Sequence, residues 1–181
     1  MTQVFDTEFR DILGAEFVSV VGGLATGAIL AIQEDVVLAV PGLLIIFPGF
    51  LELRGNISGS LAARIAAGLY LGELTAGDWR HRLVVGNLVG SFVLVIVVCG
   101  VLGGLAYAYT VFIFGINATQ LLVIPLLAGV LANLIEIPLT LAATFAVYRR
   151  GHDPNDVIGP FVTSTGDVTS VLALFVAVML V

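Results

Sequence analysis

The chain has 181 residues, of which 59% are hydrophobic and 11% are charged, whereas an ordinary soluble domain is about 45–50% apolar and about 25% charged. Its formal net charge is −6 at pH 7, it contains no lysine, and Cys99 is its one cysteine. The composition excludes a soluble globular domain, and the cysteine count excludes a disulfide framework within one chain. We expect an all-α integral membrane protein, a single domain over residues 1–181 with five transmembrane helices.

Five apolar segments are long enough to cross a bilayer core of about 30 Å, which takes about 20 helical residues. The second segment is too long for one straight span at about 1.5 Å per residue, so it should be a broken or kinked helix, or a span with a cytoplasmic extension. Its apolar pattern stops at Leu53 and resumes after Arg54, Gly55 and Asn56, where we expect the break. The expected helices cover residues 12–32, 36–74, 83–109, 118–147 and 157–181.

Arginines gather on one side of this arrangement. If the five helices alternate in direction, the opposite connections, at residues 33–35 and 110–117, contain none. The positive-inside rule then places the N-terminus in the cytoplasm and the C-terminus outside, and we expect a multi-pass protein of the plasma membrane. The arginines on the cytoplasmic side are Arg10, Arg80, Arg82, Arg149 and Arg150.

Small residues indicate where helices approach one another closely. Gly23 with Gly27, and Gly86 with Gly90, have the spacing of small-xxx-small pairs, which let helix backbones meet inside a membrane. We interpret them as packing devices rather than ligand sites. Cys99 lies in an apolar run and is expected to be a small buried hydrophobe.

The second segment carries polar and helix-weakening residues at its centre. Pro48 removes a backbone hydrogen bond, and Gly55 loosens the helix, so that carbonyl oxygens near it could face a cavity. Asn56 adds an amide oxygen. Oxygen-rich sites with few carboxylates suit hard cations, and Mg²⁺ in particular keeps several of its waters.

The last segment contains the deepest acid in the chain. Asp167 lies about ten residues into the helix, about 15 Å deep and therefore near the bilayer midplane. Ionisable groups at that depth are costly and mark functional sites by default. Hydroxyl side chains surround it, and Pro160 and Gly166 weaken the helix around it. The alternative is structural: a carboxylate paired with an arginine inside the membrane, such as Arg54.

The two polar segments repeat one arrangement. In each, a proline, Pro48 or Pro160, precedes a glycine that is followed by an oxygen-bearing residue, Asn56 or Asp167. Two broken helices with polar groups at matching midplane positions are typical of a transport site.

The remaining ionisable residues in the segments have a simpler interpretation. Arg54, Glu52, Glu136 and Glu16 form possible buried charge pairs, or the acids line an entrance; structural pairing is favoured for Glu52 and Glu136. Both histidines fall in predicted cytoplasmic loops, and no Cys/His cluster suits zinc.

Two runs resemble a known family. The run PGFLELRGNISGSLAARIAAGLYLGEL, residues 48–74, resembles the second helix of the membrane domain of the MgtE family of magnesium channels and their eukaryotic solute-carrier relatives. The run DPNDVIGPFVTSTGDVTSVLALF, residues 153–175, resembles that family's last helix. The order and spacing of the helices agree, so the resemblance covers nearly the whole chain.

The resemblance implies a homodimer in the lipid bilayer, with a path for divalent cations between the subunits and no nucleic-acid partner. It implies that Asp167 is the metal-binding residue for hydrated Mg²⁺, the transported ion, and that two copies of it neutralise one divalent ion. The function it implies is a Mg²⁺ channel or transporter rather than an enzyme. The second and fifth helices would line the pore with Pro48, Gly55, Asn56, Pro160, Thr163 and Ser164.

Departures from the family leave alternatives open. Arg54 stands where bacterial members tend to carry a second glycine and resembles the solute-carrier branch, so a Na⁺-coupled Mg²⁺ exchanger is the first alternative. A structural or assembly subunit is the alternative of another class. Family members usually carry magnesium-sensing domains before the membrane part, and since this sequence begins almost at its first helix, we do not carry their gating over.

Overall fold

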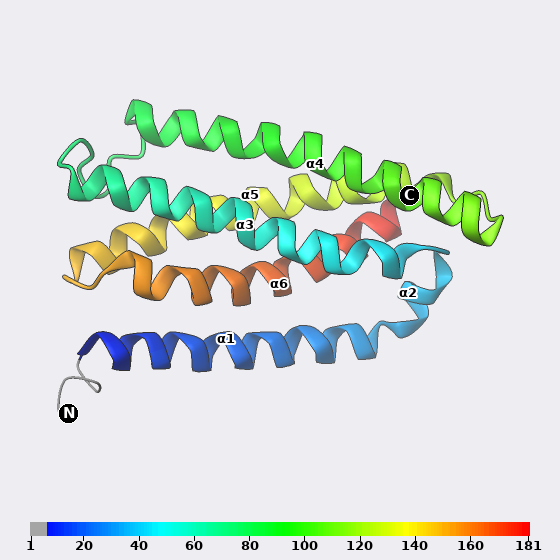
Figure 1. Cartoon of the computed structure of the whole chain (residues 1–181), viewed down its shortest axis with the longest axis horizontal. Helices are drawn as coiled ribbons and strands as arrows, with labels where there is room; N and C mark the ends of the chain where they lie inside the picture. Colours follow the sequence, from blue (N-terminus) through cyan, green and yellow to red (C-terminus); the bar gives the residue numbers. More distant parts are fainter. Residues whose placement is uncertain (1–6) are drawn as a thin grey trace.

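The computed structural model describes residues 7–181, and within that range the chain is all helical, without strands. Five long helices run side by side along the longest axis of the molecule (Figure 1). The shortest of them has 26 residues, a length of about 39 Å, which exceeds a bilayer core of about 30 Å. The helices are α1 (Thr7–Ile32), α2 (Glu34–Ala39), α3 (Leu43–Tyr70), α4 (Arg82–Phe114), the 3₁₀ helix η1 (Thr119–Leu122), α5 (Ile124–Arg149) and α6 (Pro154–Leu180).

Four stretches combine the length and the apolar composition needed to cross a membrane: Phe9–Ile32, Arg82–Phe114, Thr119–Arg149 and Pro154–Leu180. The protein is therefore a multi-pass membrane protein. The remaining long helix, α3, has 28 residues and carries Glu52, Arg54 and Arg64 within it.

The break in the second predicted segment lies earlier than expected. Residues 36–74 are divided into α2 and α3 by Val40, Pro41 and Gly42, whereas α3 is a continuous helix through residues 54–56. Val40 is extended, as the residue before a proline prefers to be, and Gly42 has φ of +85°, which favours glycine. The predicted break at Arg54-Gly55-Asn56 is wrong.

The last predicted segment is also unbroken. Helix α6 continues through Pro160 and Gly166, so of the two predicted broken helices only the second segment is broken, and at another position than expected. It begins at Pro154, three residues earlier than predicted, because Asp153 caps it by accepting a hydrogen bond from the Asn155 amide. Proline at the first helical position is favourable, since its missing N–H has no partner there in any case.

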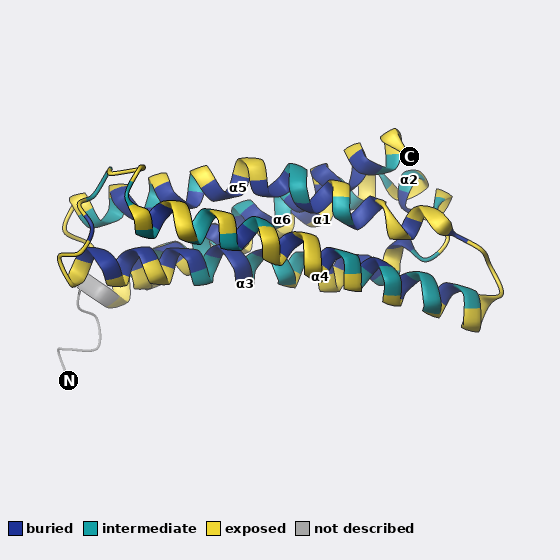
Figure 2. Cartoon of the chain, turned by 90° about the horizontal axis from the view of Figure 1, so that it is seen from above, coloured by how far each residue is buried: buried dark blue, intermediate teal, exposed yellow. Residues whose placement is uncertain are grey.

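Helix α6 lies at the centre of the bundle and packs against α1, α3 and α5 (Figure 1). Helix α4 packs on α3 and α5, and α1 packs chiefly on α6. Buried residues turn inward and exposed ones line the outer faces of the helices (Figure 2). Many exposed side chains are large and apolar, such as Leu24 and Phe112, which is the surface expected of helices that face lipid.

Close helix contacts occur at other glycines than those predicted. A Cβ at any of the four predicted glycines would meet no atom within 4 Å, so the predicted pairs make no close contact within the chain. A Cβ at Gly22 would instead lie 2.5 Å from Ser164 Oγ, and one at Gly129 would lie 2.6 Å from Cys99 Sγ. Cys99 is a free, fully buried thiol, as predicted.

Charged residues are distributed unequally between the two ends of the bundle. The start of α1, the end of α3, the α3–α4 connection and the α5–α6 connection meet at one end, and this end carries the five arginines singled out above (Figure 1). The other end holds α2 and the α4–α5 connection, which contain Glu34 and Asp35 and, among the residues described, no arginine.

Candidate functional site

Asp167 lies in the middle of α6, on the face of that helix between α1 and α3. Its neighbours one turn earlier show this: Ser164 contacts Gly22 of α1, and the hydroxyl of Thr163 would lie 3.9 Å from a Cβ at Gly55 of α3. Residues three and four positions apart share a face of a helix. Asp167 is half-buried, and its side-chain carboxylate forms no hydrogen bond or ion pair among the residues that the structure describes.

Exposure along this face of α6 changes at Asp167. On the side of the arginine-bearing end, Gly159 and Thr163 are exposed, whereas Ser170 and Leu174, beyond Asp167, are fully buried. The open face of α6 thus reaches from the arginine-bearing end to mid-depth and ends at the acid. A side chain placed there can meet an ion that enters with part of its water.

Helix α3 adds polar groups beside this face. Asn56 is exposed and Gly55 is half-buried, one position from it. The antiparallel register is set by Gly55 opposite Thr163, and by a small cavity that Gly59 and Gly159 both line. Continuing that register places Glu52, which is exposed, at the level of Asp167. We call Glu52, Gly55, Asn56, Thr163 and Asp167 the α3–α6 polar strip.

The other predicted pore residues are less open than this strip or distant from it. Ser164 is buried against α1, and Pro160 is half-buried one turn before it. Pro48 is exposed and borders an apolar cavity with Leu44 and Phe47, near the opposite end of the bundle. The structure therefore brings together Gly55, Asn56, Thr163 and Asp167 from the predicted set. Pro160 and Ser164 lie beside them on α6 but are half-buried and buried respectively, and Pro48 is distant.

Arg54 and Glu136 are buried together behind the strip, on the far side of Gly166. A Cβ at Gly166 would lie 3.6 Å from Glu136 Oε1 and 4.0 Å from Arg54 Cβ. Arg54 donates a hydrogen bond from Nη1 to Asn133 Oδ1, and no ion pair joins it to Glu136. The structure does not pair Asp167 with Arg54, and it leaves Glu16 and Glu52 exposed on the chain instead of in buried charge pairs.

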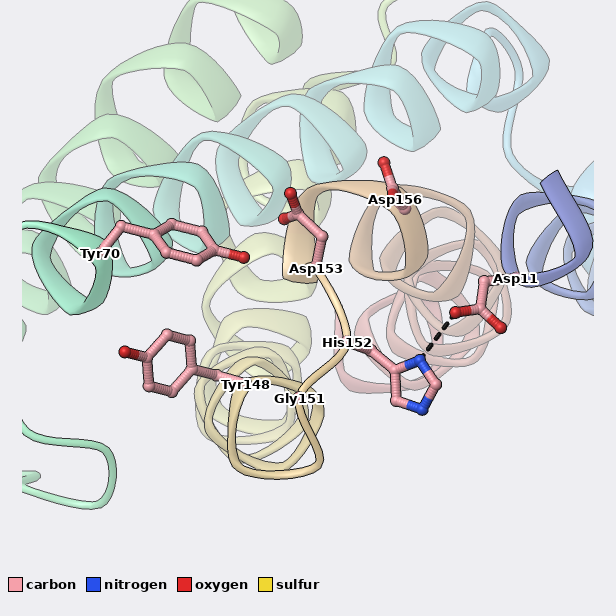
Figure 3. A pocket seen from close by; sticks show the side chains of 7 residues that line it. All are labelled: Asp11, Tyr70, Tyr148, Gly151, His152, Asp153 and Asp156. Atoms are coloured by element: carbon pink, nitrogen blue, oxygen red, sulfur yellow. Dashed lines mark hydrogen bonds and ion pairs between the residues drawn. The ribbon is translucent and has the colours of Figure 1, made fainter. Parts of the chain in front are cut away.

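A polar cavity of about 370 Å³ opens at the arginine-bearing end (Figure 3). His152 Nδ1 there lies 2.7 Å from Asp11 Oδ2, at hydrogen-bond distance, which ties the α5–α6 loop to α1. Asp156 lines the same cavity and lies eleven residues, about three turns, before Asp167 on α6. Sequence reasoning missed this cavity, although the α6 cap at Asp153 and Pro154 was a local signal for where the helix begins.

The family can now be assigned. A sequence model of the MgtE family, described as a divalent cation transporter, matches residues 47–177, which include the whole α3–α6 polar strip. No curated protein sequence matches the chain. The family is one of transporters rather than enzymes. Because the match covers well over half of the sequence and contains the open face of α6, the chain belongs to the MgtE family of divalent cation transporters.

Proposed function

We propose that the protein carries hydrated Mg²⁺ across the plasma membrane through a path between two subunits, with Asp167 as the ion-binding residue. The observation that carries this proposal is the position of Asp167: mid-helix, at the inner end of an open polar face, and without a protein partner among the described residues. A carboxylate at mid-depth in a membrane is costly unless a cation or a positive side chain compensates its charge.

The chemistry of the strip suits a hydrated ion. Mg²⁺ binds one or two carboxylates and keeps several waters, so direct contact with many protein oxygens is unnecessary. Two copies of Asp167 on a shared axis would supply two negative charges for one divalent ion. Asn56 and Thr163 carry oxygens beside it that can accept hydrogen bonds from the bound waters.

A second copy of the chain explains why the strip is exposed. Glu52, Asn56 and Thr163 are exposed on a single chain although they lie within long membrane helices. Lipid tails cannot satisfy such groups, whereas a partner subunit enclosing a wet path can. The proposal thus includes a homodimer, α3 as a fifth span, and a cytoplasmic arginine-bearing end.

One alternative within transport has an observation in its favour. Arg54 and Glu136 are both fully buried beside Gly166, close to the path, and buried charges of opposite sign can take part in coupling to Na⁺. A Na⁺-coupled exchanger would move Mg²⁺ at a rate that depends on the sodium gradient, whereas a channel would not. The alternative of a structural subunit held by an Asp167–Arg54 pair has no contact to support it.

The test is Mg²⁺ flux into liposomes that contain the purified protein. We expect saturable flux with the wild type, and a loss of at least about tenfold with Asp167→Asn, since the substitution keeps the shape but removes the charge that binds the ion. Asp35→Asn, at an exposed position of α2, is the matched control and should leave the flux unchanged. Wild-type flux in Asp167→Asn would refute the assigned site.

A further inference from the structure

A cluster of polar side chains from three helices is enclosed behind Asp167. Thr165 Oγ1 lies 2.8 Å from Glu136 Oε1, and Thr169 Oγ1 lies 2.9 Å from Glu136 Oε2. Each carboxylate oxygen therefore accepts a hydrogen bond from one threonine hydroxyl. Arg54 bonds to Asn133, whose amide nitrogen reaches the Ser91 carbonyl on α4 at 3.4 Å. We call Arg54, Asn133, Glu136, Thr165 and Thr169 the inner polar cluster.

The charged residues of the cluster and Asn133 are fully buried, whereas Thr165 and Thr169 are half-buried. Arg54, Asn133 and Glu136 are each 0% exposed. A buried charge that loses its partner destabilises a protein strongly, and hydrogen bonds to charged groups are among the strongest in an interior. The Arg54–Asn133 bond therefore joins α3 to α5, and the bonds of the two threonines to Glu136 join α6 to α5.

The two threonines bracket Asp167 along α6. They stand two positions before and two positions after it, and two positions of an α-helix correspond to a turn of about 200°. The hydroxyls that bind Glu136 thus point away from the face that carries Asp167. Attachment at two points, one helical turn apart, sets the rotation of α6 and its position along its own axis.

We propose that Glu136 is a positioning residue for the cation site: through Thr165 and Thr169 it fixes the rotation of α6 that presents Asp167 to the path. This inference rests on the proposed function of Asp167. Loosening the attachment lets α6 rotate, which displaces the carboxylate and weakens ion binding while the path itself remains.

The test uses the threonines, because Glu136→Gln would also change the charge balance of the buried region around Arg54 and so affect folding as well as positioning. The double variant Thr165→Val, Thr169→Val keeps the shape of both side chains and removes both hydroxyls. We expect its apparent KM for Mg²⁺ flux in liposomes to rise about tenfold, the size expected for a lost hydrogen bond to a charged group, with the maximal rate largely kept.

Two further variants separate positioning from general loosening of the bundle. Thr165→Ser, Thr169→Ser restores the hydroxyls and should restore the wild-type KM. Thr110→Val, Thr144→Val removes two buried hydroxyls that bond only to carbonyls of their own helices, at 2.8 and 2.7 Å. Since Thr165 and Thr169 also approach such carbonyls, this control accounts for that contact and should leave the KM unchanged.

A second readout does not require transport. In a Cys99→Ala background, Asp167→Cys reports the rotation of α6 through its rate of reaction with a water-soluble thiol reagent, and the double valine variant should slow that reaction. If wild-type liposomes take up no Mg²⁺ but this slowing is seen, the proposed function fails and the positioning by Glu136 stands. If the wild type transports, and neither KM nor the reaction rate changes in the valine variant, the inference is overturned.

Discussion

Adjacent glycines in α1 have different surroundings, and this leads to a prediction for single substitutions. Gly22→Ala would place a Cβ 2.5 Å from Ser164 Oγ and 2.6 Å from Ser164 Cβ. Such overlap at a close helix contact should cost about 1–3 kcal/mol, because α1 and α6 must move apart. Thermal unfolding of the purified protein in detergent, followed by the loss of its monodisperse peak in size-exclusion chromatography, measures the effect.

Gly23→Ala is the matched control, one position away in the same helix. Its Cβ would meet no atom within 4 Å, and replacing a helical glycine with alanine gains about 0.5–1 kcal/mol. The two variants should therefore shift the unfolding temperature in opposite directions. Equal shifts would contradict the placement of α1 against α6.

The depth of a side chain in the membrane could be predicted from the sequence, but the side of the bundle toward which it points could not. Asp167 was identified from its count along an apolar segment, which a helix converts directly into depth. Arg54 and Glu52 were grouped together as possible buried charges, although residues two positions apart lie on opposite sides of a helix. Only the packing of α3 against α5 and α6 decides which side is enclosed, and it encloses Arg54.

The junction between α2 and α3 should be the most sensitive backbone position at the end of the bundle opposite the arginine-bearing end. Gly42 has φ of +85°, and a Cβ there would lie 2.2 Å from Thr110 Oγ1 and 2.8 Å from Leu121 Cδ1. Gly42→Ala therefore combines backbone strain, about 1–2 kcal/mol for an L-residue in this region, with a clash against α4 and η1. We expect a clear fall in unfolding temperature.

Gly115→Ala measures the cost of backbone strain without a steric clash. Gly115 ends α4 with φ of +69°, and a Cβ there would meet nothing within 4 Å. Its unfolding temperature should fall less than that of Gly42→Ala in the same assay. If the two variants had the same unfolding temperature, the close contact between Gly42 and α4 would be contradicted.

The five long helices were predicted in number and order, but the break in the second was misplaced. A proline inside a helix removes one hydrogen bond, and neighbouring helices tolerate that in a membrane protein, as at Pro48 and Pro160. At Pro41 the chain also has Gly42 next to it, so an extended residue and a left-handed residue follow one another and the helix ends. The pattern of apolar residues alone does not distinguish these cases.

The whole molecule has one end rich in arginine, and its orientation in the membrane follows from that asymmetry. Arg10, Arg82 and Arg149 lie on three different helices yet meet at the same end of the bundle (Figure 1). Positively charged segments are retained in the cytoplasm during insertion. The open face of α6 would then lead from the cytoplasm to Asp167, and the cavity beside His152 would lie at its mouth.

Single cysteines at the two ends test this orientation in intact cells. In a Cys99→Ala background, Gln120→Cys and Thr75→Cys each replace an exposed residue, at the α4–α5 and α3–α4 connections respectively. A thiol reagent that cannot cross membranes should label Gln120→Cys in intact cells, and should label Thr75→Cys only after the cells are permeabilised, because the positive-inside rule predicts that the arginine-bearing end stays inside. The reverse labelling pattern would contradict this orientation. The open face of α6 would then admit ions from outside the cell rather than from the cytoplasm.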